Sequence, residues 1–292
     1  MIFQGAYTAL ITPFKNGAID QDAYRELIEW QIEQGIDGLV PCGTTGEAAT
    51  MTHEEQGEVI RICVEQAKGR VPVIAGAGSN NTKEAVNLTI LAKQAGADAT
   101  LQITPYYNKP TPQGLVEHFR ALSHDASMPF ILYNVPGRTG LNALPETIAR
   151  IVKEVPDVIG VKEATGNLAQ CSDLIEQCPK GFVVFSGDDF TVLPLLALGG
   201  HGAISVVSNI APKMVADMCA AFRAGDTAKA KDIHYKLQPL NRAMFLETNP
   251  IPVKTSLGMM GMLETSFRLP LVPLLDENEQ ELKRVLKKSE II

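Results

Sequence analysis

The sequence predicts a (β/α)8 TIM barrel of the α/β class, followed by a C-terminal helical domain. Short apolar runs rich in Val, Ile and Ala alternate with helical patterns about every 30 residues, which is typical of repeated βα units. After about residue 225 this alternation stops, and the remaining chain shows helical patterns interrupted by prolines. These two observations together indicate one barrel with a helical appendage.

Eight strands are expected. Several of the apolar runs are apolar on both faces, as strands covered by helices must be. Eight such strands, each followed by a helix, are the elements of a closed (β/α)8 barrel. The expected strands span residues 6–13, 38–43, 71–78, 99–105, 129–136, 158–164, 182–188 and 202–208.

The segments between the strands carry apolar stripes at helical spacing. Two of these stripes are Tyr24, Leu27, Ile28 and Ile32, and Val59, Ile60, Cys63, Val64 and Ala67. Thr52 and Glu55 have the spacing of a capping box, and Pro145 and Pro212 lie where a first helical turn would begin. We expect these helices to cover the outside of the barrel.

The last part of the chain is expected to be helical. Its helices should be broken by prolines, because proline lacks an N–H and clashes with the preceding turn. These prolines are Pro239, Pro250, Pro252, Pro270 and Pro273. No low-complexity linker precedes this part, so it should pack on the barrel. The expected division is a catalytic barrel over residues 1–224 and a helical domain over residues 225–292.

The composition favours a small-molecule partner. A formal net charge of −7 and a pI of about 5.3 argue against binding to nucleic acid or to anionic lipid. No basic leader is present, and no apolar stretch approaches the roughly 20 residues that span a bilayer. The five cysteines lack metal-ligand spacing, which indicates reduced core thiols. We expect a cytoplasmic protein.

Polar side chains gather at the ends of the predicted strands. In barrels of this class the active site lies at the C-terminal ends of the strands, so these residues are the candidates for chemistry. They are Thr44, Thr45, Glu47, Tyr106, Tyr107, Tyr133, Arg138, Lys162, Asp188 and Asp189.

Lys162 is the leading candidate for a nucleophile. Strand alternation places it on one face with Val158 and Gly160, directed into the barrel, with Gly160 leaving room beside the amine. Burial disfavours the ammonium, and only the neutral amine attacks a carbonyl. The alternative is an ordinary ion pair with a carboxylate such as Glu163 or Glu47.

The remaining candidates suit an anionic substrate. Thr44 and Thr45 lie in GTTGE, where hydroxyls and backbone N–H groups can bind a carboxylate, but the loop lacks the GK[ST] ending of a nucleotide site. Tyr133 is either a proton carrier or an ordinary buried tyrosine, and Arg138 offers a planar fork for a carboxylate. The five histidines show no metal-binding spacing, so no metal or cofactor is expected.

The polar motifs together are similar to those of one family. GTTGE, TPYYN, ILYNVPGRTG, GVKEATGN and SGDD, in this order and at these spacings, resemble the dihydrodipicolinate synthases of the pyruvate-dependent class I aldolase superfamily. The resemblance covers nearly the whole chain. It implies a lyase that condenses pyruvate with L-aspartate 4-semialdehyde through a lysine Schiff base, in the diaminopimelate route to lysine and without a cofactor.

The resemblance also implies roles for individual residues. Lys162 would form the Schiff base with pyruvate, whose carboxylate Thr45 and the loop backbone would hold. Tyr133 would shuttle protons through Thr44 and Tyr107. These assignments make Lys162, Tyr133, Thr44 and Tyr107 the expected catalytic residues.

Further expectations concern the second substrate and the assembly. Arg138 would bind the carboxylate of aspartate semialdehyde, and Gly187 and Ile204 would line the pocket through backbone groups. In the family Tyr107 reaches the active site of a neighbouring subunit, which implies a homotetramer built as a dimer of dimers.

Feedback inhibition by L-lysine is a further expectation, which two positions oppose. The matching positions at the dimer interface are Ala48, Ala49, His53, Gln56, Asn80, Glu84 and Tyr106. Gln56 stands where inhibited members commonly have histidine, and Ala48 stands where a serine is frequent. The sequence therefore leaves the lysine response open.

Three other functions compete with the synthase. N-acetylneuraminate lyase and keto-deoxy sugar acid aldolases also form a pyruvate imine, but they generally lack an arginine at the place of Arg138. The GRTG segment thus favours the synthase. A metal-assisted barrel hydrolase and a barrel that binds ligands without catalysis are alternatives from other classes.

Overall fold

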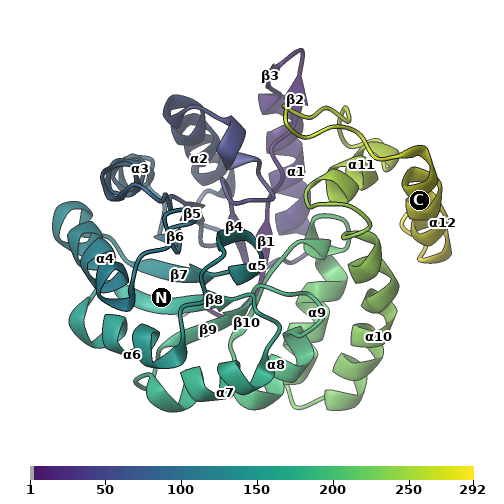
Figure 1. Cartoon of the computed structure of the whole chain (residues 1–292). Coiled ribbons are helices and arrows are strands. Elements are labelled where there is room, and N and C mark those ends of the chain that lie inside the picture. Colours follow the sequence, from purple (N-terminus) through teal and green to yellow (C-terminus); the bar gives the residue numbers. More distant parts are fainter. Residues whose placement is uncertain (1–2) are drawn as a thin grey trace.

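The computed structural model describes residues 3–292, and it confirms the predicted barrel. Among these residues the parallel strands are β1 (Gly5–Ala9), β4 (Gly38–Val40), β5 (Ile74–Gly76), β6 (Ala99–Ile103), β7 (Phe130–Asn134), β8 (Val158–Glu163), β9 (Val183–Ser186) and β10 (Gly202–Ser205). They form one eight-stranded sheet in the order β4-β1-β10-β9-β8-β7-β6-β5. A parallel bridge between Leu39 and Val73 joins the two edges of this sheet and closes it (Figure 1).

Helices surround the strands as an outer ring (Figure 1). The helices that follow the strands in turn are α1 (Gln21–Glu33), α2 (His53–Ala67), α3 (Thr82–Gln94), α4 (Pro112–Ala126), α6 (Pro145–Glu154), α7 (Leu168–Gln177), α8 (Val192–Leu198) and α9 (Pro212–Arg223). A small hairpin, β2 (Phe14–Lys15) and β3 (Ala18–Ile19), precedes α1, and the short helix α5 (Pro136–Thr139) precedes α6. Each strand therefore returns through an outer helix to the next, as a parallel barrel requires.

Two apolar layers explain why the strands are apolar on both faces. One layer fills the barrel, where the rings of Tyr7 and Phe185 lie 5.1 Å apart between centroids. The other lies between the strands and the outer helices, and includes Leu132 and Phe119. Burial of each such side chain contributes roughly 1.5–3 kcal/mol. The core therefore stabilises the strand ends that carry the polar candidates.

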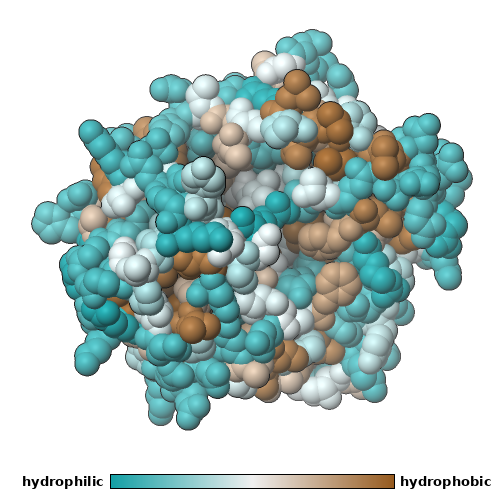
Figure 2. Space-filling view, in the orientation of Figure 1, coloured by the Kyte–Doolittle hydropathy of each residue, from teal (hydrophilic) through white to brown (hydrophobic). Residues whose placement is uncertain are grey.

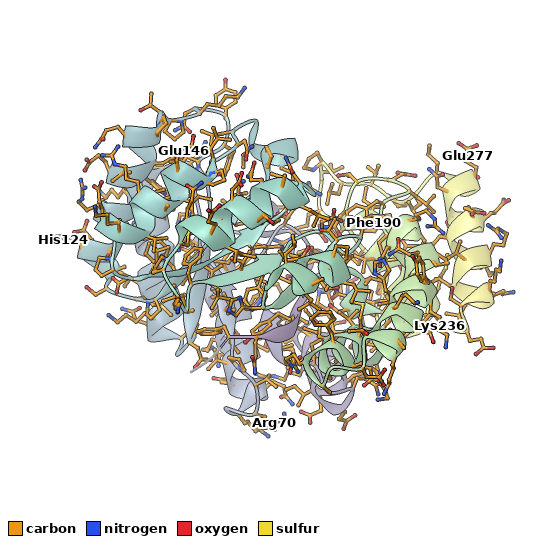
Figure 3. The ribbon with its side chains drawn as sticks, turned by 90° about the horizontal axis from the view of Figure 1, so that it is seen from below. Arg70, His124, Glu146, Phe190, Lys236 and Glu277 are labelled. Carbon is orange, nitrogen blue, oxygen red and sulfur yellow. The ribbon has the colours of Figure 1, made fainter. Side chains whose placement is uncertain are left out.

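The predicted helix starts are confirmed. Thr52 Oγ1 accepts a hydrogen bond from the Glu55 N–H at 3.2 Å, and Glu55 Oε2 accepts from the Thr52 N–H at 2.9 Å. Pro145 and Pro212 are the first residues of α6 and α9. In the side view of Figure 3, Glu146 and Arg70 lie at opposite ends of the molecule. Glu146 lies in the first turn of α6, which follows β7 and α5 along the chain, so the end of the molecule at Glu146 is the one where the strands finish.

Three helices complete the chain beside the barrel: α10 (Thr227–Ala243), α11 (Ile251–Met259) and α12 (Asp276–Lys288). The predicted break at Pro239 is wrong, because α10 continues through this residue. Proline removes the bond to the carbonyl four residues earlier, which belongs to Tyr235. Tyr235 is largely exposed, so water can satisfy that carbonyl. Within residues 3–292, every helix is too short or too polar to cross a membrane.

A buried ion pair joins α11 to the loop after β4. Lys254 is fully buried, its Nζ lies 2.5 Å from Glu47 Oε1, and the same Nζ lies 4.1 Å from the centroid of the Phe14 ring. Both side chains of the pair are shielded from solvent. Removing one partner of such a pair leaves a buried charge without compensation.

We expect Lys254→Met to lower the free energy of unfolding by about 3–5 kcal/mol, because Glu47 would lose its buried counter-charge. Denaturant titration measures this loss. Arg284→Met is the matched control, since the Arg284–Glu281 pair lies on the surface, where ion pairs contribute little. Equal unfolding midpoints for the two variants would contradict this account of the buried pair.

Candidate active site

A cavity of about 330 Å³ lies at the C-terminal ends of the strands. Figure 2 shows a recess near the centre of this face of the molecule. The structure brings together seven of the predicted site residues in its wall: Thr44, Thr45, Tyr133, Arg138, Lys162, Gly187 and Asp188. Polar groups from five different segments of the barrel therefore converge on one small volume.

Lys162 occupies the floor of this cavity. It lies near the end of β8, its side chain is 6% exposed, and its Cα pairs with that of Tyr133 in β7. The Lys162 Nζ lies 4.3 Å from the centroid of the Tyr133 ring. The amine thus faces an aromatic surface inside an enclosed space.

The ion pairs considered for Lys162 are not found among residues 3–292, where no carboxylate oxygen lies within 4 Å of its amine. Glu47 pairs with Lys254. Glu163 accepts hydrogen bonds from the Asn134 side chain at 2.9 Å and from the backbone N–H of Thr165 at 2.8 Å. Both carboxylates are therefore committed elsewhere.

Burial lowers the pKa of Lys162 to about 8 from its usual 10.5. The carboxylate of Asp189 acts to raise this pKa, and the Arg138 guanidinium acts to lower it. With a pKa near 8, about a tenth of the amine is neutral at pH 7. The cavity thus holds a nucleophile that is partly active without a further base.

The predicted face of Lys162 is partly wrong. The register of β7 against β8 shifts between Phe130 and Ile131, which pair with Val158 and Gly160 and leave Ile159 as an extra residue. This bulge turns Val158 outward into the layer beneath the helices, because one added residue reverses the alternation.

The glycine that makes room for the amine is Gly187, not Gly160. A Cβ on Gly160 would lie 2.6 Å from the backbone oxygen of Val183, so this glycine permits close approach of the neighbouring strand. A Cβ on Gly187 would lie 2.9 Å from Lys162 Cε and 2.7 Å from Ala164 Cβ. Gly187 therefore leaves space for the lysine side chain.

Tyr133 is placed to exchange a proton with a molecule in the cavity. Burial raises its pKa to about 12, while the Arg138 cation and a hydrogen bond with Thr44 act in the opposite direction. Its hydroxyl is thus neutral at physiological pH, and Thr44, which carries a second hydroxyl, lines the same cavity. Such a pair can pass a proton in either direction.

Thr45 and Arg138 share one partner, Asn249, which lies before α11. The Asn249 Nδ2 donates to Thr45 Oγ1 at 2.9 Å, and an Arg138 Nη2 donates to the Asn249 backbone oxygen at 3.2 Å. Asn249 is 5% exposed and lines the cavity. Our sequence reasoning missed this residue, although it begins the NPIPVK segment that ends at Lys254.

Two of the predicted catalytic and substrate-binding residues lie outside this cavity wall. Tyr107 is 90% exposed, with a backbone φ of 68°, a left-handed conformation that a tyrosine rarely adopts. Ile204 is 1% exposed, and its side chain packs inside the barrel. The residue two positions after it, Val206, lines the cavity instead.

Asp189 ties the end of β9 to the end of β10. Its carboxylate oxygen accepts from the N–H groups of Val206 and Val207, both at 3.0 Å. Asp189 is buried, and these two backbone N–H groups are hydrogen-bond donors to its carboxylate. Residues 3–292 contain no group of three or more His, Cys, Asp or Glu side chains placed to hold a metal ion.

A second cavity of about 330 Å³ adjoins the first across Thr44 and Tyr133. Most of the residues considered for lysine binding line it: Ala48, Ala49, His53, Gln56, Glu84 and Tyr106. Asn80 lies beside it, and its Nδ2 donates to the backbone oxygen of Tyr106 at 3.2 Å. The Gln56 Nε2 donates to the Ala48 oxygen at 3.1 Å, so this amide is already used within the chain.

Comparison with known proteins agrees with this geometry. The model of the dihydrodipicolinate synthetase family matches residues 2–289. The 4-hydroxy-tetrahydrodipicolinate synthase of Maridesulfovibrio salexigens is 81% identical over 292 residues, which cover all of both chains.

Two solved structures are similar over nearly their whole length. The dihydrodipicolinate synthase of Acinetobacter baumannii, complexed with pyruvate, is 45% identical with a TM-score of 0.96, and 99% of each chain is covered. The enzyme of Cyanidioschyzon merolae, solved with lysine bound, is 39% identical with a TM-score of 0.96 over 99% of each chain.

Proposed function

Because the chain belongs to the dihydrodipicolinate synthetase family, we propose that it is a lyase that condenses pyruvate with L-aspartate 4-semialdehyde through a Schiff base on Lys162. The observation that carries this proposal is a buried amine with a lowered pKa and, among residues 3–292, no carboxylate partner, at the floor of a cavity lined by carboxylate-binding groups. The product would enter the diaminopimelate route to lysine. We place the reaction in the cytoplasm.

The cavity residues suit the steps up to formation of the carbon–carbon bond. The neutral Lys162 amine adds to the keto carbon of pyruvate, and loss of water gives a protonated imine. The imine withdraws electrons, so the pyruvate methyl group loses a proton, and the resulting enamine attacks the aldehyde. The Thr45 hydroxyl binds the pyruvate carboxylate, while Tyr133 and Thr44 carry protons to and from the reacting oxygen. The step needs no oxidant and no cofactor.

Arg138 is the proposed site for the carboxylate of the second substrate. Its guanidinium borders the cavity and is oriented by the Asn249 backbone oxygen. A planar guanidinium pairs with a carboxylate through two parallel hydrogen bonds. Initial rates with pyruvate plus aspartate semialdehyde, measured beside the cleavage of N-acetylneuraminate, test this choice. A clear preference for the sugar acid would overturn it.

We further propose that the active enzyme is a homotetramer built as a dimer of dimers, in which Tyr107 enters the site of a neighbouring subunit. The exposure of Tyr107 and its left-handed backbone conformation support this role. A strained and exposed aromatic residue indicates a constraint that the isolated chain does not explain. Sedimentation equilibrium would give the mass of the assembly, and a monomer with full activity would contradict the proposal.

The pH dependence of the reaction should follow Lys162. We expect kcat/KM for pyruvate to rise with pH through about 8 and then to level off, because only the neutral amine reacts. Burial lowers the lysine pKa, so this limb lies well below the usual 10.5. Steady-state rates measured at intervals of about half a pH unit between pH 6 and pH 10 would show this rise in kcat/KM. A limb near 10.5 would mean that the reacting amine is solvated.

Gly187→Ala should cut pyruvate trapping by borohydride at least about tenfold, because the new Cβ would lie 2.9 Å from Lys162 Cε and displace the amine. Gly57→Ala in α2 is the matched control, since no described residue beyond its chain neighbours and its own helix backbone lies within 4 Å of its Cβ position. Equal trapping in both variants would show that the Lys162 side chain does not need this space.

The second cavity is our candidate for binding L-lysine, the end product. Glu84 offers a carboxylate for an ammonium group, and Tyr106 and His53 stand in the same wall. Gln56 cannot accept a proton as a histidine would, so we expect binding at this site to lack the contribution that a titrating ring at position 56 would make. Calorimetric titration of the wild type and of Glu84→Gln with L-lysine tests the site. Equal affinities would remove Glu84 from it.

A further inference from the structure

Asn249 reaches the active site from outside the barrel's own repeats. It lies between α10 and α11, more than 200 residues from Thr45 along the chain, yet the two side chains are joined by a buried hydrogen bond of 2.9 Å. Segments this distant are joined only when tertiary packing holds them together. The contact therefore places part of the helical appendage in the wall of the catalytic cavity.

The hydrogen bond gives the Thr45 hydroxyl a donor partner, while the buried Oδ1 of Asn249 has no hydrogen-bond partner among residues 3–292. A hydroxyl has one proton to donate and two lone pairs that accept. The Asn249 Nδ2 occupies a lone pair of Thr45 Oγ1, and Thr45 makes no hydrogen bond as a donor within residues 3–292. The Thr45 proton is thus left for an acceptor in the cavity. A carboxylate is an acceptor only, so it matches this free proton.

The same residue also orients Arg138. Its backbone oxygen accepts from an Arg138 Nη2 at 3.2 Å, so one N–H group of the guanidinium is held by Asn249 in the wall that both residues line. The Lys254–Glu47 pair anchors the appendage to the threonine loop close by, which limits how far Asn249 can move. One asparagine therefore holds two separate anion-binding groups at a fixed spacing.

We propose that Asn249 is a positioning residue that turns the Thr45 hydroxyl and the Arg138 guanidinium toward the cavity, and so couples the helical appendage to recognition of both substrate carboxylates. This role rests on the proposed function of the cavity. Its effect is exerted through Thr45 and Arg138. Loss of the Asn249 side chain removes the contact with Thr45 and leaves the backbone contact with Arg138. It should therefore weaken pyruvate binding more than turnover, since uniform binding is then what is removed.

Two substitutions separate positioning from bulk packing. Asn249→Ala should raise the KM for pyruvate about tenfold, with a smaller change in kcat, because a hydrogen bond near a charged ligand is lost. Asn249→Asp keeps the shape of the side chain, but its carboxylate accepts the Thr45 proton and adds a negative charge. The KM of Asn249→Asp should therefore exceed that of Asn249→Ala, although aspartate packs more like asparagine.

A double-mutant cycle with Thr45→Val shows whether Asn249 acts through the hydroxyl. In the Thr45→Val background, Asn249→Ala should leave the KM for pyruvate unchanged. If the two substitutions raised the KM for pyruvate independently, so that their fold-changes multiplied in the double variant, the proposal would be overturned. An Asn249→Asp variant with the wild-type KM would also overturn it. Asn241→Ala is the matched buried control, since its Nδ2 bonds to the Asp189 backbone oxygen and it is outside the cavity wall. Its KM should not change.

Folding and reaction class are checked in the same samples. Each variant is compared by its unfolding midpoint and by borohydride trapping at saturating pyruvate, where weaker binding is overcome. If the wild-type protein traps no pyruvate, the proposed function of the cavity is contradicted. If the wild type traps pyruvate but a folded Asn249→Ala variant has the wild-type KM, only the positioning role is contradicted.

Discussion

Lys162→Ala should lower kcat for the condensation by more than about a thousandfold, because it removes the group that forms the covalent intermediate. Lys162 lies at the floor of the cavity, and residues 3–292 place no second lysine in its wall that could replace it. The fold should survive, since alanine fits the buried position without a new charge. Initial rates with pyruvate and aspartate semialdehyde measure the effect.

The control for this variant is Lys153→Ala, which removes an exposed lysine of α6. It should retain the parental rate, and both variants should keep the wild-type circular dichroism spectrum. A Lys162→Ala protein that turned over substrates at the parental rate would exclude covalent catalysis by this residue.

Tyr133→Phe should lower kcat by about 10²–10⁴-fold, because the ring is kept while the proton-carrying hydroxyl is lost. The aromatic surface 4.3 Å from the Lys162 amine would remain, so the lysine pKa should change little. At equilibrium the pyruvate adduct should still form, and its rate of formation should fall. Rapid-mixing measurement of adduct formation separates rate from extent.

Tyr235→Phe is the matched control, since this tyrosine of α10 is 66% exposed and lies far from the cavity wall. Its kinetics should equal those of the wild type. If Tyr133→Phe also kept the wild-type kcat, the proton would have to travel by another path, and the Thr44–Tyr133 pair would lose its proposed role.

The barrel follows from local patterns that the sequence displays openly. Each strand is an apolar run with few alternatives, and each outer helix carries its stripe and its start signal, such as the Thr52–Glu55 capping box. The position of Lys162 followed in the same way. A lysine at the end of a buried strand is costly unless its environment is special, so the residue stands out.

The differences arise where tertiary contacts decide the outcome. The bulge at Ile159 leaves no signal in its own segment, so the alternation that placed Val158 inside the barrel failed there. The role of Gly187 depends on how closely β8 and β9 approach beside Lys162. Asn249 meets Thr45 only after α10 has returned along the barrel. Local sequence periodicity does not specify these contacts.

The Phe190 ring illustrates the same dependence on packing. It follows Asp189 in the loop after β9, and its ring centroid lies 6.3 Å from that of Phe245, which follows α10. Figure 3 shows Phe190 between the barrel and the C-terminal helices. Both rings line the cavity, so the appendage supplies apolar as well as polar parts of its wall.

Reductive trapping with pyruvate and borohydride, followed by peptide mapping, tests the proposed Schiff base most directly. The protein should gain one pyruvate-derived group per chain, carried by the peptide that contains Lys162. A chain that stays unmodified under these conditions, or one whose adduct maps to Lys254 or to a surface lysine, would contradict the mechanism proposed for this cavity.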